Sequence, residues 1–393
     1  MQPIMSEFRT AFIGAVIVAL GSISMSIYTP AMPLLVDEFS TSVAAVQFTL
    51  TIYLAGYAAA ILACGSLSDA FGRRRTAIGF LVVYLIGCVV ALAAFTVELL
   101  TAARLLQGIG AAAGVSISRA IVRDQYHGQI SMRIMSLIGL IFAVGPAVAP
   151  TLGGAILSAF GWHALFIMMA GYSVFALAVI VLLCRETNLM RSSDMVRPAV
   201  VMRTYRAILM NRHFLHGSLV LGLSVGGIYT LAVVLPFVLV ETVKLTPTQF
   251  GMAMILQTGA YVIGSAIAAR LLRQIRGEDL LTAGIGIVAA ASIALAGSGL
   301  LHTTLWTVML PVGLWAFGAA FIIPGATTLA LAEFPHAAGA ASAMTGFMQI
   351  GGGLVGSLLV ALLLAAPSAA FYTILPAMAF AAAACRLGYL LRV

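Results

Sequence analysis

The stretch Gly65-Ser-Leu-Ser-Asp-Ala-Phe-Gly-Arg-Arg-Arg75 interrupts a long apolar sequence with one acid, two glycines and three consecutive arginines. The residues before it, 46–67, could cross a bilayer, and residues 76–95 could cross back, because a membrane-spanning helix needs about 20 apolar residues. A connection this short predicts a tight helical hairpin. Arginines resist translocation, so they also predict that this connection faces the cytoplasm.

The composition indicates that the solvent of this chain is lipid. Of its 393 residues, 62% are hydrophobic and only 8% are charged, whereas soluble proteins carry about 25% charged residues. The first apolar stretch, 12–32, is too long for a signal peptide and is expected to be retained. The sequence therefore predicts an all-α polytopic membrane protein with twelve transmembrane helices, at 9–34, 45–67, 76–96, 99–121, 132–159, 163–184, 213–240, 248–272, 280–301, 305–331, 339–365 and 369–391.

The charged residues predict the orientation of these helices. With twelve spans, one side receives nearly all arginines and the other receives Lys244, while Arg104 lies inside a span. We expect the arginine side to be cytoplasmic, with both termini inside. The net charge of +8 is thus a topology signal, and no nucleic-acid footprint on a soluble face is present. The arginines of the first side are Arg9, Arg73, Arg74, Arg75, Arg119, Arg123, Arg133, Arg185, Arg191, Arg197, Arg203, Arg206, Arg212, Arg270, Arg273, Arg276, Arg386 and Arg392.

The longest polar stretch, 185–212, halves the chain. We interpret it as a cytoplasmic linker between two six-helix bundles, 1–184 and 213–393, which is the layout of a transporter built from two similar halves. The sequence repeat between the halves is weak. Gly264-Ser265, followed by Arg270 and Arg273, resembles a worn copy of the 65–75 stretch that has lost its acid.

Within the 65–75 stretch, Gly65 and Gly72 permit close helix approach and a tight turn, and Asp69 can cap a helix or pair with an arginine. A positive-inside hairpin would explain the arginines alone. The whole block, however, resembles the loop between the second and third helices of the major facilitator superfamily. The resemblance implies two six-helix bundles, and it gives Asp69 and Arg73 a gating role in an inter-helix charge relay.

A second informative stretch runs from Leu99 to Ala113 and places Arg104 inside the fourth span. A buried charge costs about 2.5–3.5 kcal/mol on insertion scales, so it is expected to face a cavity or a partner; alternatively, it snorkels to the outer headgroups. Gln107 and Gly108 follow nearly one turn later, and Gly110 and Ala111 allow tight packing. The pattern resembles the fourth-helix motif of drug:proton antiporters, which implies that Arg104, with Gln107, takes part in proton coupling.

Two further stretches concern conformational change. Arg119, Arg123 and Asp124 could form a charge cluster with the 65–75 loop, or they could be a solvated loop. The fifth span contains Gly145, Pro146 and Pro150, and two prolines four residues apart make a bendable helix. This span resembles the fifth-helix motif of the antiporter branches and thereby favours export over uptake.

The resemblance extends over nearly the whole chain. Tyr28-Thr-Pro-Ala-Met-Pro33, Leu235-Pro-Phe-Val-Leu239, and the eleventh-span stretches 335–349 and 351–353 resemble the Bcr/CflA multidrug-efflux subfamily. Membership implies an antiporter of the bacterial inner membrane that exports drug-like or metabolite molecules and contributes to antibiotic resistance. It also implies a monomer, in a lipid bilayer, driven by the proton gradient.

One position departs from this subfamily. Two residues before Tyr28 the subfamily usually carries an acid, and this chain has Ser26. No other acid lies deep in a span, so proton coupling either moves to edge groups such as Glu98 or Asp124 or is weaker than in the family. The missing acid favours neutral or anionic solutes over permanent cations, with Arg104 available to an anion.

The substrate cavity of such a protein is expected between the two halves, near the middle of the membrane. Candidates are polar or aromatic residues at that depth, although aromatic residues in membrane helices often serve packing or interface anchoring. A lone amide in hydrocarbon needs a partner, which favours the two glutamines. The substrate-binding candidates are Ser26, Tyr28, Tyr53, Tyr57, Phe142, Tyr229, Gln257, Tyr261, Trp315 and Gln349.

The sequence gives no sign of enzymatic chemistry. The four cysteines have neither disulfide nor metal spacing, no histidine pair has metal spacing, and no phosphate-binding Gly-x-x-x-x-Gly-Lys loop occurs. We therefore expect no metal, no cofactor and no nucleic-acid partner. The leading prediction is a secondary transporter; the alternatives are a proton-independent exporter or uptake carrier, and a membrane sensor or scaffold without flux.

Overall fold

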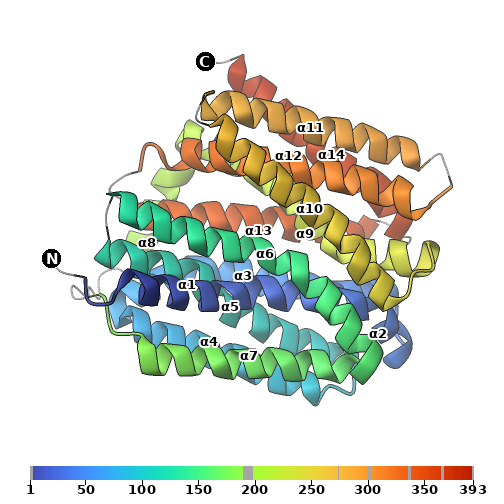
Figure 1. Ribbon diagram of the computed structural model, residues 1–393, viewed down its shortest axis with the longest axis horizontal. Helices are drawn as coiled ribbons and strands as arrows, with labels where there is room; N and C mark the ends of the chain where they lie inside the picture. The colour runs from blue at the N-terminus through green and yellow to red at the C-terminus, as the bar shows by residue number, and fades with distance from the viewer. Residues whose placement is uncertain are drawn as a thin grey trace.

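The structure of the protein is a computed structural model that describes residues 3–126, 128–188, 198–272, 274–299, 302–334, 338–363 and 367–391. Within these ranges the secondary structure is helical, with no strand. Figure 1 shows two bundles of long helices lying side by side, with both chain termini at one end of the molecule.

Twelve long helices form the two bundles. The first bundle contains α1 (Glu7–Tyr28), which continues through a 3₁₀ turn into α2 (Met32–Glu38), and then α3 (Val43–Phe71), α4 (Arg73–Leu92), α5 (Val97–Gln125), α6 (Gly128–Phe160) and α7 (Trp162–Leu183). A short helix, α8 (Pro198–Leu209), precedes the second bundle. This bundle contains α9 (Arg212–Phe237), which ends in a π-helical turn (Val238–Thr242), and then α10 (Pro247–Leu271), α11 (Gly277–Ser298), α12 (Leu305–Leu331), α13 (Ala338–Leu363) and α14 (Pro367–Leu390).

The predicted spans agree with these helices. In the described residues, 11 helices are long and apolar enough to cross a membrane. The twelfth long helix is α6, with 33 residues; the side chains of Phe142 and Pro146 within it lie outside the described set. The all-α, twelve-helix prediction is therefore confirmed.

The two bundles are related by internal pseudo-symmetry. Most helix pairs that pack in the first bundle have a counterpart six spans later, and so does the contact between bundles, where α3 packs on α13 and α10 packs on α6. The two halves share too little sequence to show this symmetry. The same two helices can pack on each other with different apolar residues at the contact, because packing tolerates exchanges among apolar side chains of suitable volume. The matched pairs are α3–α5 with α10–α12, α4–α5 with α11–α12, α1–α6 with α9–α13, α1–α5 with α9–α12, and α4–α7 with α11–α14.

The hairpin at residues 65–75 is tighter than predicted. The sequence predicted a loop of several residues, but α3 continues to Phe71 and α4 begins at Arg73, so Gly72 alone makes the turn. Its φ of 99° lies in the region that side chains avoid. The polar residues of this stretch are therefore helical and occupy fixed positions at the ends of α3 and α4.

The fourth span, α5, is the centre of the first bundle because its glycines allow three helices to approach. A Cβ at Gly108 would overlap the Tyr53 carbonyl of α3, one at Gly110 would meet the Tyr84 backbone of α4, and one at Gly114 would overlap Ile17 of α1. The predicted tight packing at Gly110 is confirmed. Gly65 differs, because a Cβ there would meet nothing within 4 Å, so the prediction that it permits close helix approach is wrong.

Replacing Gly108 with alanine is expected to lower the melting temperature of the detergent-purified protein. Overpacking a tight contact costs about 1–3 kcal/mol, and here the obstacle is backbone that cannot swing away. Gly171→Ala in α7 is the matched control, since its Cβ would meet nothing within 4 Å, and alanine favours a helix by up to about 1 kcal/mol. Equal melting temperatures for the two variants would contradict the packing at Gly108.

Candidate functional site

A buried arginine joins three helices at the end of the molecule that carries the termini, which we call the arginine-rich end. Arg73 at the start of α4 is only 4% exposed. Its Nη1 lies 2.5 Å from Asp69 Oδ1 on α3, and its Nε and Nη2 donate to both oxygens of Asp124 on α5, at 2.9 and 3.3 Å. Charge-assisted bidentate pairs are among the strongest polar contacts. The predicted pairing of Asp69 with an arginine is confirmed.

Residues after α7, which no sequence pattern marked, complete this cluster. The Glu186 carboxylate accepts hydrogen bonds from the backbone N–H groups of Arg73 and Arg74, at 2.8 and 3.3 Å, and so caps the positive end of α4. Thr187 donates to Asp124 at 2.9 Å, and Asn188 donates to the Asp69 carbonyl at 2.8 Å. We call Asp69, Arg73, Asp124, Glu186 and Thr187 the brace, because they tie α3, α4, α5 and the segment after α7 into one body.

Arg119 and Arg123 do not belong to the brace. The sequence had grouped them with Asp124, but they lie on another face of α5, where they line a cavity. Arg119 donates to Ser342 of α13 at 2.7 Å, across the two bundles. The expectation of one charge cluster for all three residues is therefore wrong for the arginines, because a helix turns Asp124 away from the face that carries Arg119 and Arg123.

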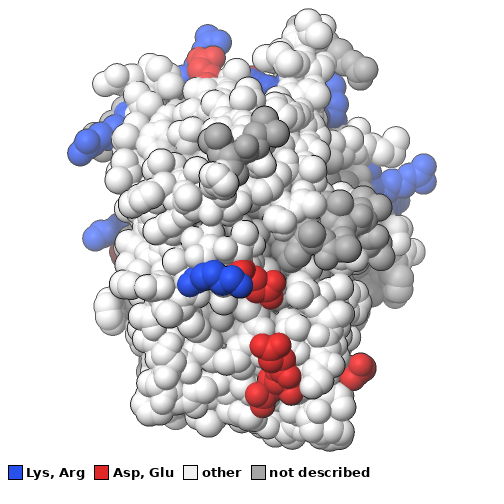
Figure 2. All heavy atoms as spheres, turned by 90° about the vertical axis from the view of Figure 1, so that its right-hand side faces the viewer, with Lys and Arg blue, Asp and Glu red and all other residues white. Residues whose placement is uncertain are grey.

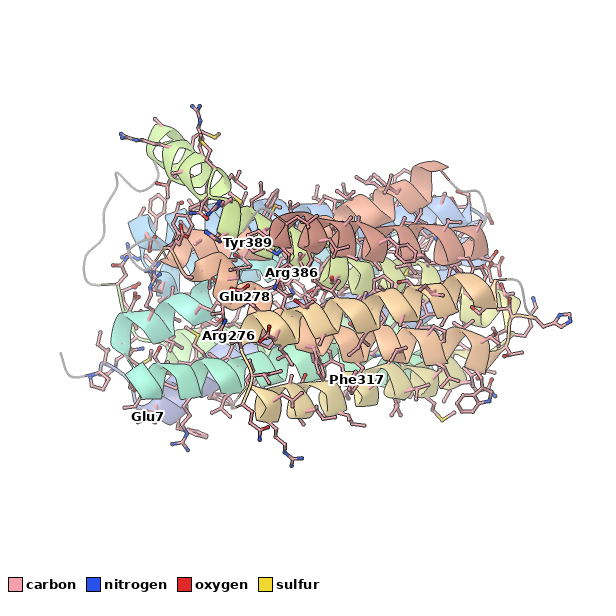
Figure 3. The ribbon with its side chains drawn as sticks, turned by 90° about the horizontal axis from the view of Figure 1, so that it is seen from above. Glu7, Arg276, Glu278, Phe317, Arg386 and Tyr389 are labelled. Carbon is pink, nitrogen blue, oxygen red and sulfur yellow. The ribbon has the colours of Figure 1, made fainter. Side chains whose placement is uncertain are left out.

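The second bundle has a charge cluster of its own at the same end (Figure 3). Arg386 of α14 is buried and donates to Thr282 of α11 at 3.1 Å and to the Glu278 carbonyl at 3.2 Å, and its Nη2 lies 3.5 Å from the Glu278 carboxylate. Its guanidinium also lies 5.7 Å from the Tyr389 ring. The second bundle thus pairs an arginine with an acid outside the worn repeat at 264–273.

A cavity of about 420 Å³, which we call the vestibule, lies at the arginine-rich end between the bundles. Its wall includes Asp69, Arg73, Arg119 and Arg123 of the first bundle and Ser342 of the second, and α8 covers part of it. Tyr205 of α8 donates to the Leu62 carbonyl at 3.1 Å. Burial raises the pKa of the Tyr205 phenol, and the Asp69 carboxylate raises it further, so this hydroxyl stays a proton donor.

A smaller cavity of about 70 Å³, the central cavity, lies deeper between the bundles. It is lined by four of the predicted substrate-binding residues, Ser26, Tyr57, Tyr229 and Gln257, and by Pro150. The Tyr57 hydroxyl and Gln257 Oε1 are buried without a hydrogen-bond partner. An unpaired buried polar atom costs about 1–3 kcal/mol, so these two atoms are poised to accept a ligand or water.

Arg104 lies in the interior of the first bundle and is 0% exposed. Its guanidinium is sandwiched between the rings of Tyr28 and Tyr53, at 4.5 and 4.3 Å, and donates to Gln107 at 2.6 Å. The Nε and Nη2 atoms have no hydrogen-bond partner. The snorkelling alternative is therefore wrong; Arg104 faces partners, and its charge is balanced by aromatic faces rather than by a carboxylate.

The other predicted residues lie outside the central cavity. Tyr28 and Tyr53 are buried against Arg104, and their hydroxyls bond Thr49 at 2.7 Å and the Gly21 carbonyl at 2.9 Å. Trp315 is buried inside the second bundle and donates to the Ser224 carbonyl at 3.0 Å. Tyr261 and Gln349 are half-buried on α10 and α13. Gly145 is buried where a Cβ would overlap Ser22 of α1.

The opposite end of the molecule, the far end, is closed. The Thr151 hydroxyl of α6 donates to the Gly251 carbonyl of α10 at 2.7 Å. The hydroxyl oxygens of Ser158 on α6 and Thr248 on α10 lie 3.0 Å apart. Figure 2 looks onto this end, where acidic side chains gather around a single basic one and the other basic groups appear only at the rim. Glu98, a predicted coupling residue, is exposed in the first turn of α5. In the described part of the chain, no group of three or more His, Cys, Asp or Glu could hold a metal ion.

Comparisons with known proteins agree with this architecture. The uncharacterized MFS-type transporter YdgK of Bacillus subtilis is 29% identical over 350 residues, 88% of this chain and 86% of its own. The bicyclomycin resistance protein homolog of Haemophilus influenzae is 26% identical and covers 91% of each chain. The structure of a D-xylose–proton symporter has a TM-score of 0.72 at 18% identity, over 96% of this chain and 97% of its own.

A human organic anion transporter, MFSD10, has a TM-score of 0.65 at 18% identity, over 97% of this chain and 99% of its own; at this identity both solved structures speak for the fold alone. The sequence profile of the Major Facilitator Superfamily matches residues 14–357. A chain matched over this length, with twelve helices in two pseudo-symmetric bundles, belongs to the Major Facilitator Superfamily.

Proposed function

We propose that this protein is a secondary active transporter of the bacterial inner membrane that exports small drug-like or metabolite molecules by alternating access. In this proposal the arginine-rich end faces the cytoplasm. The bundles 1–184 and 213–393 rock against each other as a monomer, joined by the linker 185–212. The protein moves its substrate and does not transform it.

The observation that carries the proposal is the arrangement of the cavities. The central cavity is lined from both bundles, the vestibule lies between it and the arginine-rich end, and the far end is closed by contacts between α6 and α10. Space on one side of a central cavity and contacts on the other support a carrier that works by alternating access. The names of the relatives support export: one is a bicyclomycin resistance protein homolog, and another, of Citrobacter koseri, is the multidrug resistance protein MdtL, 28% identical over 336 residues.

The test of export is a growth-inhibition panel of neutral, anionic and cationic antibacterial compounds, applied to an efflux-deficient bacterial strain that overproduces the protein. We expect protection against at least one compound, followed by counterflow of that compound in proteoliposomes. Protection without counterflow would assign the protein to a sensor or scaffold instead.

The energy source has two candidates. The family resemblance favours proton antiport, whereas Ser26 favours facilitated movement without protons: it lines the central cavity, and no acid is present among the described residues that line this cavity. Proton movement on adding substrate to proteoliposomes with a trapped pH dye decides between the two.

Ser26→Asp is expected to make transport more dependent on pH. A carboxylate in this buried cavity has a raised pKa, because desolvation disfavours its charged form. The variant is therefore protonated and neutral at acidic pH and becomes charged as the pH rises. We expect its counterflow of a neutral substrate to fall by at least about tenfold between pH 5 and pH 8, which corresponds to 1.4 kcal/mol. The uncharged variant Ser26→Asn is the control; an identical pH profile for both would place Ser26 outside the substrate path.

A further inference from the structure

Arg119 lies deep between the bundles and faces open space. Protein atoms surround it on most sides, yet its side chain is exposed to the vestibule. Its one hydrogen bond in the described structure goes to the Ser342 hydroxyl, a neutral acceptor, at 2.7 Å. No described carboxylate lies within ion-pair distance of it. Arg119 thus places a positive charge on a cavity wall, and none of the carboxylates that the structure describes forms an ion pair with it.

The other charges of the vestibule do not neutralise Arg119. Asp69 and Arg73 also line this cavity, but the Asp69 carboxylate is bound to Arg73, and Asp124, the second carboxylate on Arg73, does not line the cavity. Arg123, one turn further along α5, lines the vestibule as well and has no ion-pair partner in the described part of the chain. Among the described residues that line the vestibule, the unpaired positive charges are therefore those of Arg119 and Arg123, on one face of one helix.

The vestibule, whose wall carries Arg119, is the neighbour of the central cavity along α3. This helix lines the central cavity at Tyr57 and the vestibule about two turns later at Gly65. A molecule that leaves the vestibule for the central cavity therefore passes this guanidinium before it meets the unpaired Tyr57 hydroxyl and Gln257 Oε1. No acid lines the central cavity among its described residues, so no group there opposes a negative charge.

We propose that Arg119 recognises a negatively charged group, a carboxylate, a sulfonate or a phosphate monoester, on the molecule that the protein carries. The inference rests on the proposed transport function and names its substrate class. The anion replaces the Ser342 hydroxyl as the acceptor for Arg119, because it adds the attraction between opposite charges to the hydrogen bond and can accept two guanidinium N–H groups at once. This exchange removes a link between α5 and α13, so binding of the anion and the contact between the bundles are coupled.

The first test measures the electric field of the vestibule without a substrate. Ser116 lies one turn before Arg119 on the same wall, so Ser116→Cys places a thiol beside it. The probes are two thiol reagents of similar size, an anionic sulfonatoethyl and a cationic trimethylammonioethyl methanethiosulfonate, with rates normalised to those of a thiol in solution. We expect a normalised preference for the anionic reagent that falls by about tenfold or more on Arg119→Gln.

Two matched variants define the cause of that preference. Arg119→Lys keeps the charge and is expected to keep the preference, which separates charge from misfolding. Arg206→Gln removes an exposed charge on α8 that does not line the vestibule, and it is expected to change nothing. Background labelling is low, because three native cysteines are buried and the fourth is half-buried, and burial raises the pKa of the Cys184 thiol to about 11.

The second test measures transport with two dyes that share one ring skeleton, the anion fluorescein and the cation rhodamine 123, in proteoliposomes. Wild-type protein is expected to move fluorescein at least tenfold faster, and Arg119→Gln is expected to abolish this difference. A preference for the cation, or an unchanged ratio in Arg119→Gln, would overturn the inference. If neither dye moves, the result contradicts the proposed transport function. The labelling experiment then decides whether Arg119 attracts anions, and a labelling ratio that Arg119→Gln does not alter overturns the inference.

Discussion

Asp69→Asn is expected to slow substrate counterflow at least tenfold while the protein still accumulates in the membrane. The asparagine keeps the size of the side chain but removes the negative charge 2.5 Å from Arg73. Arg73 stays buried and keeps Asp124, so the fold survives. Asp69 is the acid of the brace that lies on the vestibule wall, and its side chain is 38% exposed, so its loss acts where the two bundles move against each other.

Asp124→Asn is the informative comparison for Asp69→Asn. Asp124 is more buried, with its side chain 15% exposed, and it accepts from Arg73 and Thr187. Breaking a buried pair costs about 3–5 kcal/mol, so this variant is expected to lower the melting temperature more than Asp69→Asn does. If Asp69→Asn showed counterflow at the wild-type rate, with an equal amount of protein in the liposomes, Asp69 would have no role in the conformational change.

Arg104→Ala is expected to reduce export in energised vesicles at least tenfold and to lower the melting temperature as well. The guanidinium fills the space between the Tyr28 and Tyr53 rings, and a desolvated cation–π contact contributes about 2 kcal/mol. Alanine leaves that space empty and deprives Gln107 Oε1 of its donor. Both rings belong to helices that line the central cavity, so a shift of these rings changes the shape of the cavity that binds the substrate.

Arg104→Lys separates charge from shape. Lysine keeps the positive charge but cannot stack as a plane between two rings, so we expect a thermal stability between those of the wild type and the alanine variant. Export by Arg104→Lys near the wild-type rate would show that the charge matters and the stacking does not. Unchanged export by Arg104→Ala would remove Arg104 from the transport mechanism altogether.

The sequence predicts the fold well because lipid imposes a strong length and polarity rule on each span. It also predicts which residues of the first bundle form charged contacts, because Asp69, Arg73 and Arg104 are charged residues within or next to apolar spans. It could not predict the depth at which each aromatic residue lies: Tyr57 reaches the central cavity, while Tyr53, one turn earlier, turns to Arg104. Periodicity places both tyrosines on the same side of α3 and does not show which neighbour each one meets.

Contacts between residues that are far apart in the chain could not be predicted from the sequence either. Glu186 caps α4 from 113 residues away, and Arg119 reaches Ser342 across 223 residues. Nothing local marks either contact, because both depend on how two bundles and a linker are packed. The helix α8 was missed for a similar reason: its apolar face is short, and it is covered by the second bundle, where Ile208 is buried with Phe214 and Met344.

The brace also sets the order in which the chain can mature during synthesis. Its last members, Glu186 and Thr187, follow the sixth span, so the brace cannot be complete before residue 187 has been synthesised. Only then is the N-terminus of α4 capped and the first six helices locked as a unit, before the second six are complete. We therefore expect a nascent chain truncated soon after this point to hold a native first bundle already. The start of the linker thus completes the first bundle during synthesis, in addition to connecting the two bundles.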